Sequence, residues 1–183
     1  DLSTGINPRP YPLPAFAPDA WTALPDRAAF AGLEAAARVF WRVPDRAAVL
    51  AAPGASALIA RMPAVLDGTR VHIPQPTYNE HAATLQACGW LVKEVGDLDA
   101  LIGADIAVVV NPNNPDGRHW SREVLLQLIG KVGLLVVDES FADPMPEQSL
   151  VGDAGREGLL ILRSFGKFYG LAGLRLGFAL GAA

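Results

Sequence analysis

The chain has 183 residues, of which 51% are hydrophobic and 19% are charged, and its formal net charge is −4. This length is enough for one domain with a substantial core. The acidic balance, without a basic patch, argues against a nucleic-acid partner. Apolar runs such as IAVVV are far too short to cross a bilayer. No charged-then-apolar leader opens the chain, and one cysteine permits no internal disulfide, so we expect a cytoplasmic protein.

Residues 1–25 are rich in proline, which lacks an amide donor and fixes φ, so they are predicted to form an extended arm. The pattern changes at Asp26, a candidate N-cap, after which apolar residues recur at helical spacing. A short strand over 47–52 and a turn followed by a helix over 53–66 come next. We therefore divide the chain into an arm, 1–25, and one domain, 26–183.

From residue 70 onward, predicted strands alternate with predicted helices. The strands span 70–74, 91–95, 106–110, 134–138, 159–164 and 174–180, and the helices span 78–89, 98–102 and 122–129, the last capped by Ser121. Strands that are apolar throughout and separated by helices indicate a mainly parallel sheet covered on both faces. The sequence therefore predicts an α/β fold, a three-layer α/β/α sandwich with a seven-stranded, mainly parallel sheet.

The residues that follow the buried strands are the candidates for chemistry, because ligands of open parallel sheets bind beyond the carboxyl ends of the strands. In chain order they are Gly54, Ala55 and Ser56, then Tyr78, then Asn111, Asn113 and Asn114, then Asp138, then Ser164 and Lys167. Arg175 lies in the otherwise apolar run after Lys167. This convergence on one edge of the sheet is more informative than any single motif.

Each candidate also has an ordinary structural explanation. The turn that opens with Gly54 can simply cap a helix, or its amides and the helix dipole can bind a phosphate. Tyr78 can be ordinary packing, and the Asn/Pro cluster can be a plain turn. Asp138 can be an N-cap, but a carboxylate that ends an apolar strand is desolvated and then needs a cationic partner. Lys167 alone would be a surface lysine, whereas amid apolar neighbours it is suited to act as a nucleophilic amine.

The cysteine and the histidines carry weaker signals. Cys88, near the end of a predicted helix, is interpreted as a small buried residue rather than a catalytic thiol. His72, His81 and His119 are scattered without ligand spacing, so no metal site is predicted.

Taken together, the candidates predict a pyridoxal-phosphate site. This cofactor needs a lysine for its aldehyde, an acid for its pyridine nitrogen, anion donors for its phosphate and an aromatic face. Lys167, Asp138 and Tyr78 fill three of these roles. The phosphate role is filled by Ser164, Arg175 and the amides of residues 54–56.

The segments PGAS, PTY, NPNNPDG, VVDES and SFGKFYGLAGLRLGF follow one another over nearly the whole chain. In this order they resemble fold-type I pyridoxal-phosphate enzymes of the histidinol-phosphate aminotransferase-like branch. The resemblance implies that Lys167 bonds the cofactor covalently, that Asp138 pairs with its pyridine nitrogen and that Tyr78 stacks on its ring. It implies that Asn114 contacts the 3′ oxygen and lies close to the substrate. The phosphate would be held by Ser164, Arg175 and the amides of Ala55 and Ser56. A homodimer that binds the cofactor between its subunits is also implied.

Two features are similar to the threonine-phosphate decarboxylases of cobalamin synthesis within this branch. The opening DLSTGINPRPYP resembles their Ser-x-x-Ile-Asn-Pro segment, which implies that Gly5 and Ile6 line the substrate pocket. In DESF, Phe141 lacks the hydroxyl that Asp-Glu-Ala-Tyr of the aminotransferases supplies to the 3′ oxygen.

These features favour decarboxylation of a phosphorylated amino acid, L-threonine O-3-phosphate, to (R)-1-amino-2-propanol O-2-phosphate. The alternatives are an aminotransferase acting on histidinol phosphate or a related amino acid, and a cofactor-binding domain without catalysis. The resemblance also implies a small C-terminal domain whose arginines meet the substrate. We expect that domain to be absent from this chain, which ends directly after the last predicted strand, whether as an excerpt of a longer enzyme or as a truncation.

Overall fold

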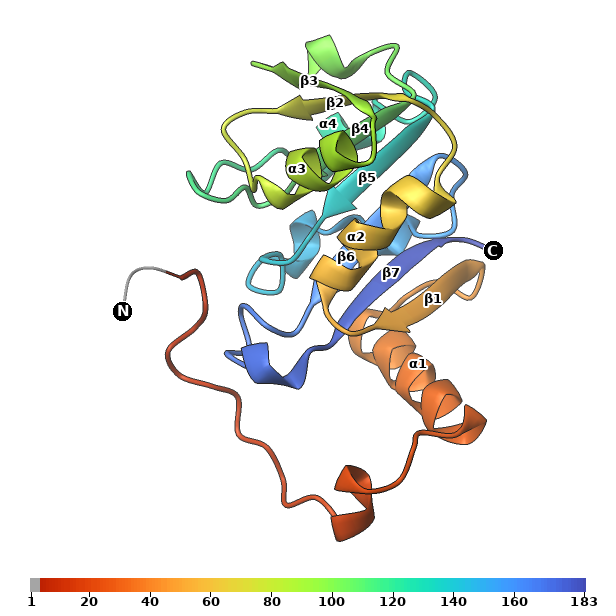
Figure 1. Ribbon diagram of the computed structural model, residues 1–183, viewed down its shortest axis with the longest axis vertical. Coiled ribbons are helices and arrows are strands. Elements are labelled where there is room, and N and C mark those ends of the chain that lie inside the picture. Colours follow the sequence, from red (N-terminus) through yellow and green to blue (C-terminus); the bar gives the residue numbers. More distant parts are fainter. Residues whose placement is uncertain (1–3) are drawn as a thin grey trace.

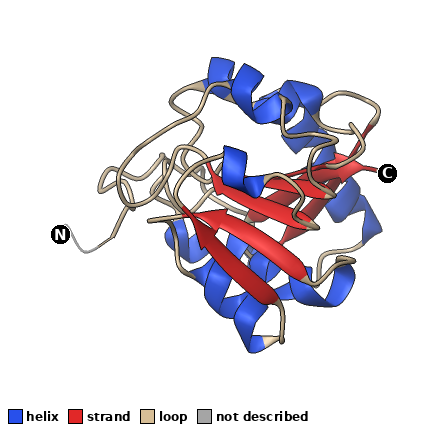
Figure 2. Cartoon of the chain, turned by 90° about the horizontal axis from the view of Figure 1, so that it is seen from above, coloured by secondary structure: helices blue, strands red, loops and turns tan. Residues whose placement is uncertain are grey.

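In the computed structural model, which describes residues 4–183, seven strands form one sheet with helices on both faces (Figures 1 and 2). The strands are β1 (Ala47–Ala52), β2 (Arg70–Pro74), β3 (Leu91–Val95), β4 (Ile106–Val110), β5 (Leu134–Asp138), β6 (Leu159–Ser164) and β7 (Gly177–Ala182). Their order is β1-β7-β6-β5-β4-β2-β3. β7 runs antiparallel to both of its neighbours, β1 and β6, and the other paired strands are parallel. The predicted three-layer α/β/α fold with a mainly parallel sheet is confirmed.

The helices are α1 (Arg27–Trp41), α2 (Ala55–Val65), α3 (Glu80–Ala87) and α4 (Arg122–Leu126). The predicted cap of α1 is confirmed, because the carboxylate of Asp26 accepts a hydrogen bond from the amide of Ala29. Helices α1 and α4 pack on one face of the sheet, and α2 and α3 pack on the other, so two buried apolar clusters form. Within residues 4–183, no helix combines the length and apolar character that a membrane span requires.

The helix predicted over 78–89 is shorter, Glu80–Ala87, and the helix predicted over 98–102 is a 3-10 turn at Asp99–Leu101. Two other predicted boundaries are wrong by three residues. The helix predicted over 122–129 ends at Leu126, because the backbone hydrogen bonds that follow tighten to the spacing of a turn. The strand predicted over 174–180 begins only at Gly177, because a 3-10 turn and the left-handed backbone of Arg175, with φ of 51°, come first.

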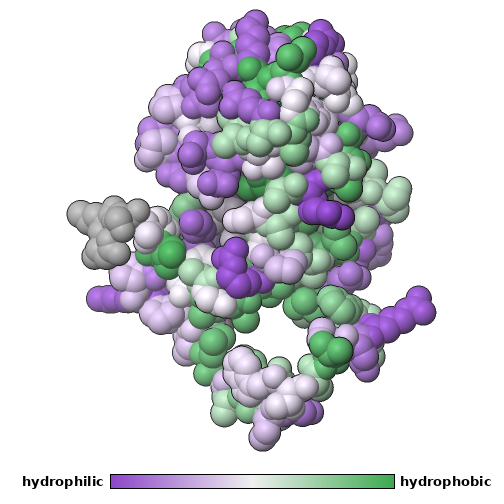
Figure 3. Space-filling view, viewed as in Figure 1, coloured by the Kyte–Doolittle hydropathy of each residue, from purple (hydrophilic) through white to green (hydrophobic). Residues whose placement is uncertain are grey.

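The predicted arm is extended apart from one 3-10 turn at Pro18–Trp21, and its first three residues lie outside the described range. In Figure 3 it loops away from the domain and leaves an open window. The amides of Asn7 and Tyr11 attach it by donating to the carbonyls of Lys167 (3.0 Å) and Tyr169 (2.8 Å). Gly170 permits this approach, because a Cβ there would lie 2.7 Å from the carbonyl oxygen of Asn7.

Gly177, at the start of β7, lets α2 approach the sheet. A Cβ at this position would lie 2.6 Å from the carbonyl carbon of Gly54 and even closer to the amide nitrogen of Ala55. Because Gly177 pairs with Ser164 of β6, the first amides of α2 lie over the end of that strand. The absence of one side chain therefore sets where α2 begins.

Gly177→Ala should push the start of α2 away from the sheet and lower the free energy of unfolding by about 1–3 kcal/mol. Urea denaturation measures this change. Gly32→Ala is the matched control, because a Cβ on Gly32 in α1 would meet nothing within 4 Å. That variant should be as stable as the wild type or more stable by up to about 1 kcal/mol. A Gly177→Ala protein of unchanged stability would contradict the close approach.

Candidate functional site

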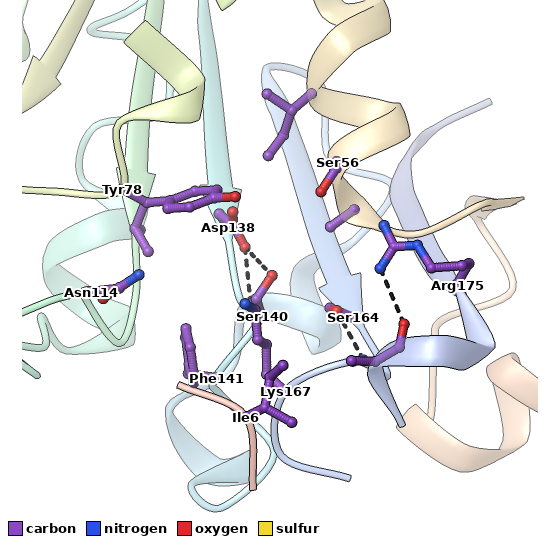
Figure 4. Close-up of a pocket in the computed structure, with 15 residues that line it drawn as sticks. Ile6, Ser56, Tyr78, Asn114, Asp138, Ser140, Phe141, Ser164, Lys167 and Arg175 are labelled. Atoms are coloured by element: carbon purple, nitrogen blue, oxygen red, sulfur yellow. Dashed lines mark hydrogen bonds between the residues drawn. The ribbon is translucent and has the colours of Figure 1, made fainter. Parts of the chain in front are cut away.

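The carboxyl ends of the parallel strands meet at one edge of the sheet, where a pocket opens beside α2 (Figure 4). Nine predicted residues line it: Ile6, Ala55, Ser56, Tyr78, Asn114, Asp138, Ser164, Lys167 and Arg175. The other two residues assigned to the cofactor or the substrate, Gly54 and Gly5, lie just behind those that line the pocket. Gly54 lies against the guanidinium of Arg175, and Gly5 lies against the ring of Phe141, which itself lines the pocket.

Asp138 ends β5 and is only 3% exposed. Its Oδ2 lies 2.9 Å from Nε2 of His81, and its Oδ1 accepts hydrogen bonds from the amide and the hydroxyl of Ser140, over 3.0 and 2.6 Å. Burial alone would raise the pKa of Asp138, but the hydrogen bonds and the attraction to His81 outweigh it, so the pKa lies below its usual value. The carboxylate is therefore ionised at neutral pH and can stabilise a positive charge in the pocket.

His81 is the partner that sequence reasoning missed. The sequence predicted a partner for the desolvated Asp138, but nothing in it showed that His81, 57 positions earlier, would be that partner. His81 lies fully buried on α3, and its ring meets the ring of Tyr78 edge-on, with centroids 6.1 Å apart. Its position in the chain could have pointed to it, because His81 lies in the first turn of a helix that begins at the same edge of the sheet as Asp138.

The start of α2 carries a cluster suited to an anion. A Cβ on Gly54 would lie 2.7 Å from Nη2 of Arg175, whose Nη1 donates to the carbonyl of Ala172 over 3.2 Å. Arg175 has the left-handed backbone that costs a non-glycine residue energy, a feature typical of functional sites. Ser56 and Ser164 face the same space (Figure 4). A guanidinium beside the positive end of a helix becomes favourable when an anion lies between them.

Lys167 lies on an irregular segment between Asp138 and the cluster at the start of α2 (Figure 4). Its Nζ is 6.0 Å from the centroid of the Phe141 ring. Its carbonyl accepts hydrogen bonds from the amides of Asn7 (3.0 Å) and Gly170 (3.1 Å). The lysine is thus held by its backbone while its amino group faces the pocket.

Tyr78 and Asn114 lie on the side of the pocket opposite Arg175 in Figure 4. Asn113 joins the two loops that carry them. Its Oδ1 accepts a hydrogen bond from Thr77 over 2.6 Å, and its Nδ2 donates to the carbonyl of Pro76 over 2.8 Å. The Asn/Pro cluster is thus a turn whose side chains also hold the neighbouring loop in place.

Two further sequence interpretations have outcomes here. Cys88 is exposed at the C-cap of α3, so the prediction that it is buried is wrong; the helix ends at Ala87 and the chain turns outward at Gly89. Within residues 4–183, no group of three or more His, Cys, Asp or Glu side chains is arranged to hold a metal ion.

The fold and the pocket define a class of protein: an α/β domain that presents a lysine, a buried carboxylate and an anion cradle at the carboxyl ends of its strands. The chain belongs to the aminotransferase class I and II family, whose model matches residues 17–183. It is 46% identical over 188 residues to a threonine-phosphate decarboxylase of Pseudomonas aeruginosa, an alignment that covers 99% of this chain and 55% of that protein.

Two solved structures are similar to the chain. One is an L-threonine-O-3-phosphate decarboxylase from Porphyromonas gingivalis, with a TM-score of 0.69 and 26% identity over 83% of this chain and 51% of that one. The other is a histidinol-phosphate aminotransferase from Sinorhizobium meliloti in complex with pyridoxal-5′-phosphate, with a TM-score of 0.69 and 23% identity over 82% of this chain and 46% of that one. The chain spans about half the length of these relatives.

These findings confirm the resemblance to fold-type I enzymes and the prediction of the large-domain fold. The enzymes of this family depend on pyridoxal phosphate, so the prediction of this cofactor is confirmed by membership of the family. The pocket fits the cofactor: the cradle beside Gly54, which a Cβ would fill, suits a phosphate, and the ionised Asp138 suits a protonated ring nitrogen.

His81→Gln tests the buried pair, because an amide can donate a hydrogen bond but carries no positive charge. The free energy of unfolding at pH 7 should fall by roughly 1–3 kcal/mol. Folding lowers the pKa of Asp138, so its ionised form stabilises the fold above the unfolded pKa of about 4, and this contribution is lost as the pH falls through the lower folded pKa. The difference from the wild type should therefore shrink below about pH 4.

His119→Gln makes the same chemical change on an exposed histidine and should alter stability by less than about 0.5 kcal/mol. Denaturant titrations of both variants across pH give the comparison. A His81→Gln deficit that stays constant with pH would show that the charge of Asp138 is not what His81 stabilises.

Proposed function

We propose that the protein is a pyridoxal-phosphate-dependent lyase that decarboxylates L-threonine O-3-phosphate to (R)-1-amino-2-propanol O-2-phosphate, a step of cobalamin synthesis. The observation that carries this proposal is the 46% identity to the Pseudomonas aeruginosa relative over 99% of this chain, the arm included. Phe141 supports it, because this residue lines the pocket with carbon where the similar aminotransferases would carry a tyrosine hydroxyl.

We assign the site residues the roles that the resemblance implies. Lys167 would bond the cofactor, Asp138 would pair with its pyridine nitrogen and Tyr78 would stack on its ring. Asn114 would contact its 3′ oxygen. The phosphate would be held by Gly54, Ala55, Ser56, Ser164 and Arg175. When bound, the cofactor supplies a sink for the electron pair released at the Cα of an amino acid.

The residues of the chain set the conditions for that chemistry. Asp138 is ionised and buried, so it favours a proton on the pyridine nitrogen. The amino group of Lys167 faces the pocket, where it can donate the proton that replaces the departing CO2 at Cα. Ile6 lines the pocket, and a Cβ on Gly5 would lie 3.0 Å from the Phe141 ring, so the arm packs closely against that ring.

An aminotransferase acting on histidinol phosphate or a related amino acid is the second candidate, because a solved histidinol-phosphate aminotransferase shares the fold. Both reactions would use the same cofactor-binding residues. They differ in which bond at Cα breaks, and contacts to the substrate decide that.

Incubating the full-length protein with threonine phosphate and pyridoxal phosphate should release CO2. Lys167→Ala should lower this rate roughly a thousandfold or more and abolish the visible absorbance of the lysine-bound cofactor. Lys93→Ala removes an exposed lysine from β3 and should leave both unchanged. Formation of glutamate from 2-oxoglutarate and histidinol phosphate, with no CO2 from threonine phosphate, would favour the aminotransferase and exclude the decarboxylase.

We further propose that the enzyme is a cytoplasmic homodimer in which the arm, 1–25, lines the substrate pocket. Large apolar side chains support the dimer, because Leu24 on the arm is 93% exposed, Trp21 is 76% exposed and Val39 on α1 is 79% exposed. Figure 3 shows apolar surface on the arm and around the window beside it. A second copy would remove this surface from water. The single cysteine suits the reducing cytoplasm.

Sedimentation analysis of the full-length protein should give the mass of a dimer. Replacing Trp21 and Leu24 together by serine should weaken the dimer by roughly tenfold or more, because two exposed apolar anchors are lost. Leu91→Ser removes a similarly exposed side chain from the edge strand β3 and should leave the dimer intact. A wild-type protein that sediments as a monomer at micromolar concentration would exclude the proposal.

A further inference from the structure

The ends of β5 and β6 present side chains to both faces of the sheet. Asp138 and Ser164 line the pocket, on the face that α2 and α3 cover, so the neighbouring Glu139 and Arg163 face the side of α1. Glu139 is fully buried and Arg163 is 2% exposed. A buried ion pair therefore lies directly behind the candidate site, and the roles proposed above do not use it.

The ion pair is part of a larger network. Nη1 of Arg163 donates to Oε2 of Glu139 over 2.8 Å, and its Nη2 donates to Asp143, in the loop after β5. Glu139 also accepts hydrogen bonds from the amide of Leu150, over 2.6 Å, and from the hydroxyl of Ser149. Because each carboxylate meets several donors, the network holds the ends of both strands and the loop in one arrangement.

Tyr169 connects this network to Lys167, two residues earlier in the chain. Its hydroxyl donates to Oδ1 of Asp143 over 2.9 Å, and its ring stacks on Phe165 with centroids 4.8 Å apart. Burial and the nearby charge of Asp143 raise the pKa of Tyr169 far above its usual value, so the hydroxyl remains a donor.

Few regular contacts fix the segment that holds Lys167. Residues 165–170 form neither strand nor helix. The amide of Phe165 donates to the carbonyl of Leu176 over 3.1 Å, and the rings of Phe165 and Tyr169 pack in an aromatic cluster. The other contacts that locate the segment are the arm contacts of Asn7 and Tyr11 and the hydroxyl of Tyr169. Of these contacts, only the tyrosine hydroxyl is a hydrogen bond to the buried network behind Asp138.

We propose that Tyr169 is a positioning residue for Lys167: its hydroxyl, held by Asp143 and through it by Arg163, fixes the lysine relative to Asp138. This inference rests on the proposed role of Lys167. A displacement of about 1 Å at a reacting group can cost about a hundredfold in rate, so one hydrogen bond at this place affects turnover.

Tyr169→Phe in the full-length, cofactor-loaded protein removes only the hydroxyl. It should lower kcat about tenfold and leave KM unchanged, because the lysine is displaced while the substrate contacts remain. Asp143→Asn keeps the shape of the acceptor but weakens it, and should change kcat in the same direction. Tyr11→Phe is the matched control, because it removes the hydroxyl of an exposed tyrosine and keeps the backbone amide that donates to Tyr169.

Amide hydrogen exchange of the cofactor-free protein gives a second readout that does not depend on activity. In Tyr169→Phe, amides of residues 165–170 should exchange about tenfold faster while those of β5 keep the wild-type rate. If wild-type protein releases no CO2 but the local exchange responds as expected, the proposed reaction fails and the positioning role stands. Unchanged exchange at 165–170, equal effects of Tyr11→Phe, or a uniform increase across the domain would each overturn the positioning role.

Discussion

The negative charge buried at the end of β5 is the constraint on which the site depends. An ionised carboxylate is costly to remove from water unless donors surround it. Asp138 meets this requirement with His81 from α3 and with Ser140 from the loop that follows it. Because His81 belongs to α3, the helix cannot shift along the sheet without breaking the pair. Tyr78, which contacts His81, is held by the same requirement. The requirement for donors around the buried Asp138 therefore fixes the positions of α3 and of the Tyr78 ring beside the pocket.

Two adjacent carboxylates share this strand end without sharing a partner. The alternation of a strand directs Asp138 to the pocket and Glu139 to the opposite face, where Glu139 pairs with Arg163 and accepts a hydrogen bond from the amide of Leu150. Burial nonetheless keeps the pKa of Glu139 above its usual value despite Arg163. The pocket face is left with one carboxylate, which meets a histidine, and the far face carries the pair formed by Glu139 and Arg163. The sheet thus separates the groups available for chemistry from those that hold the strands together.

The sequence was sufficient to predict the features that depend on local pattern and residue type. Continuous apolar runs located the central strands, and the residues after them, Asp138 and Lys167 above all, converged as parallel-sheet geometry requires. It was not sufficient for contacts between distant segments. Periodicity gives the face on which His81 or Arg163 lies, but not the partner that it meets there. The start of β7 was misplaced for a related reason, because an apolar composition favoured a strand where tertiary contacts impose a tight turn before Gly177.

The cluster suited to an anion at the start of α2 depends on two glycines that have no side chain. Gly54 leaves room for the guanidinium of Arg175, and Gly177 leaves room for the first turn of α2, so two positive groups lie close together above Ser164. The acidic residue of the pocket, Asp138, makes its hydrogen bonds to His81 and Ser140. The left-handed backbone of Arg175 adds strain at the same point. A protein that holds like charges together at a strained position gains stability when an anion binds between them, since whatever binds only the folded state stabilises it. An anion that bound at the start of α2 would therefore stabilise the folded protein.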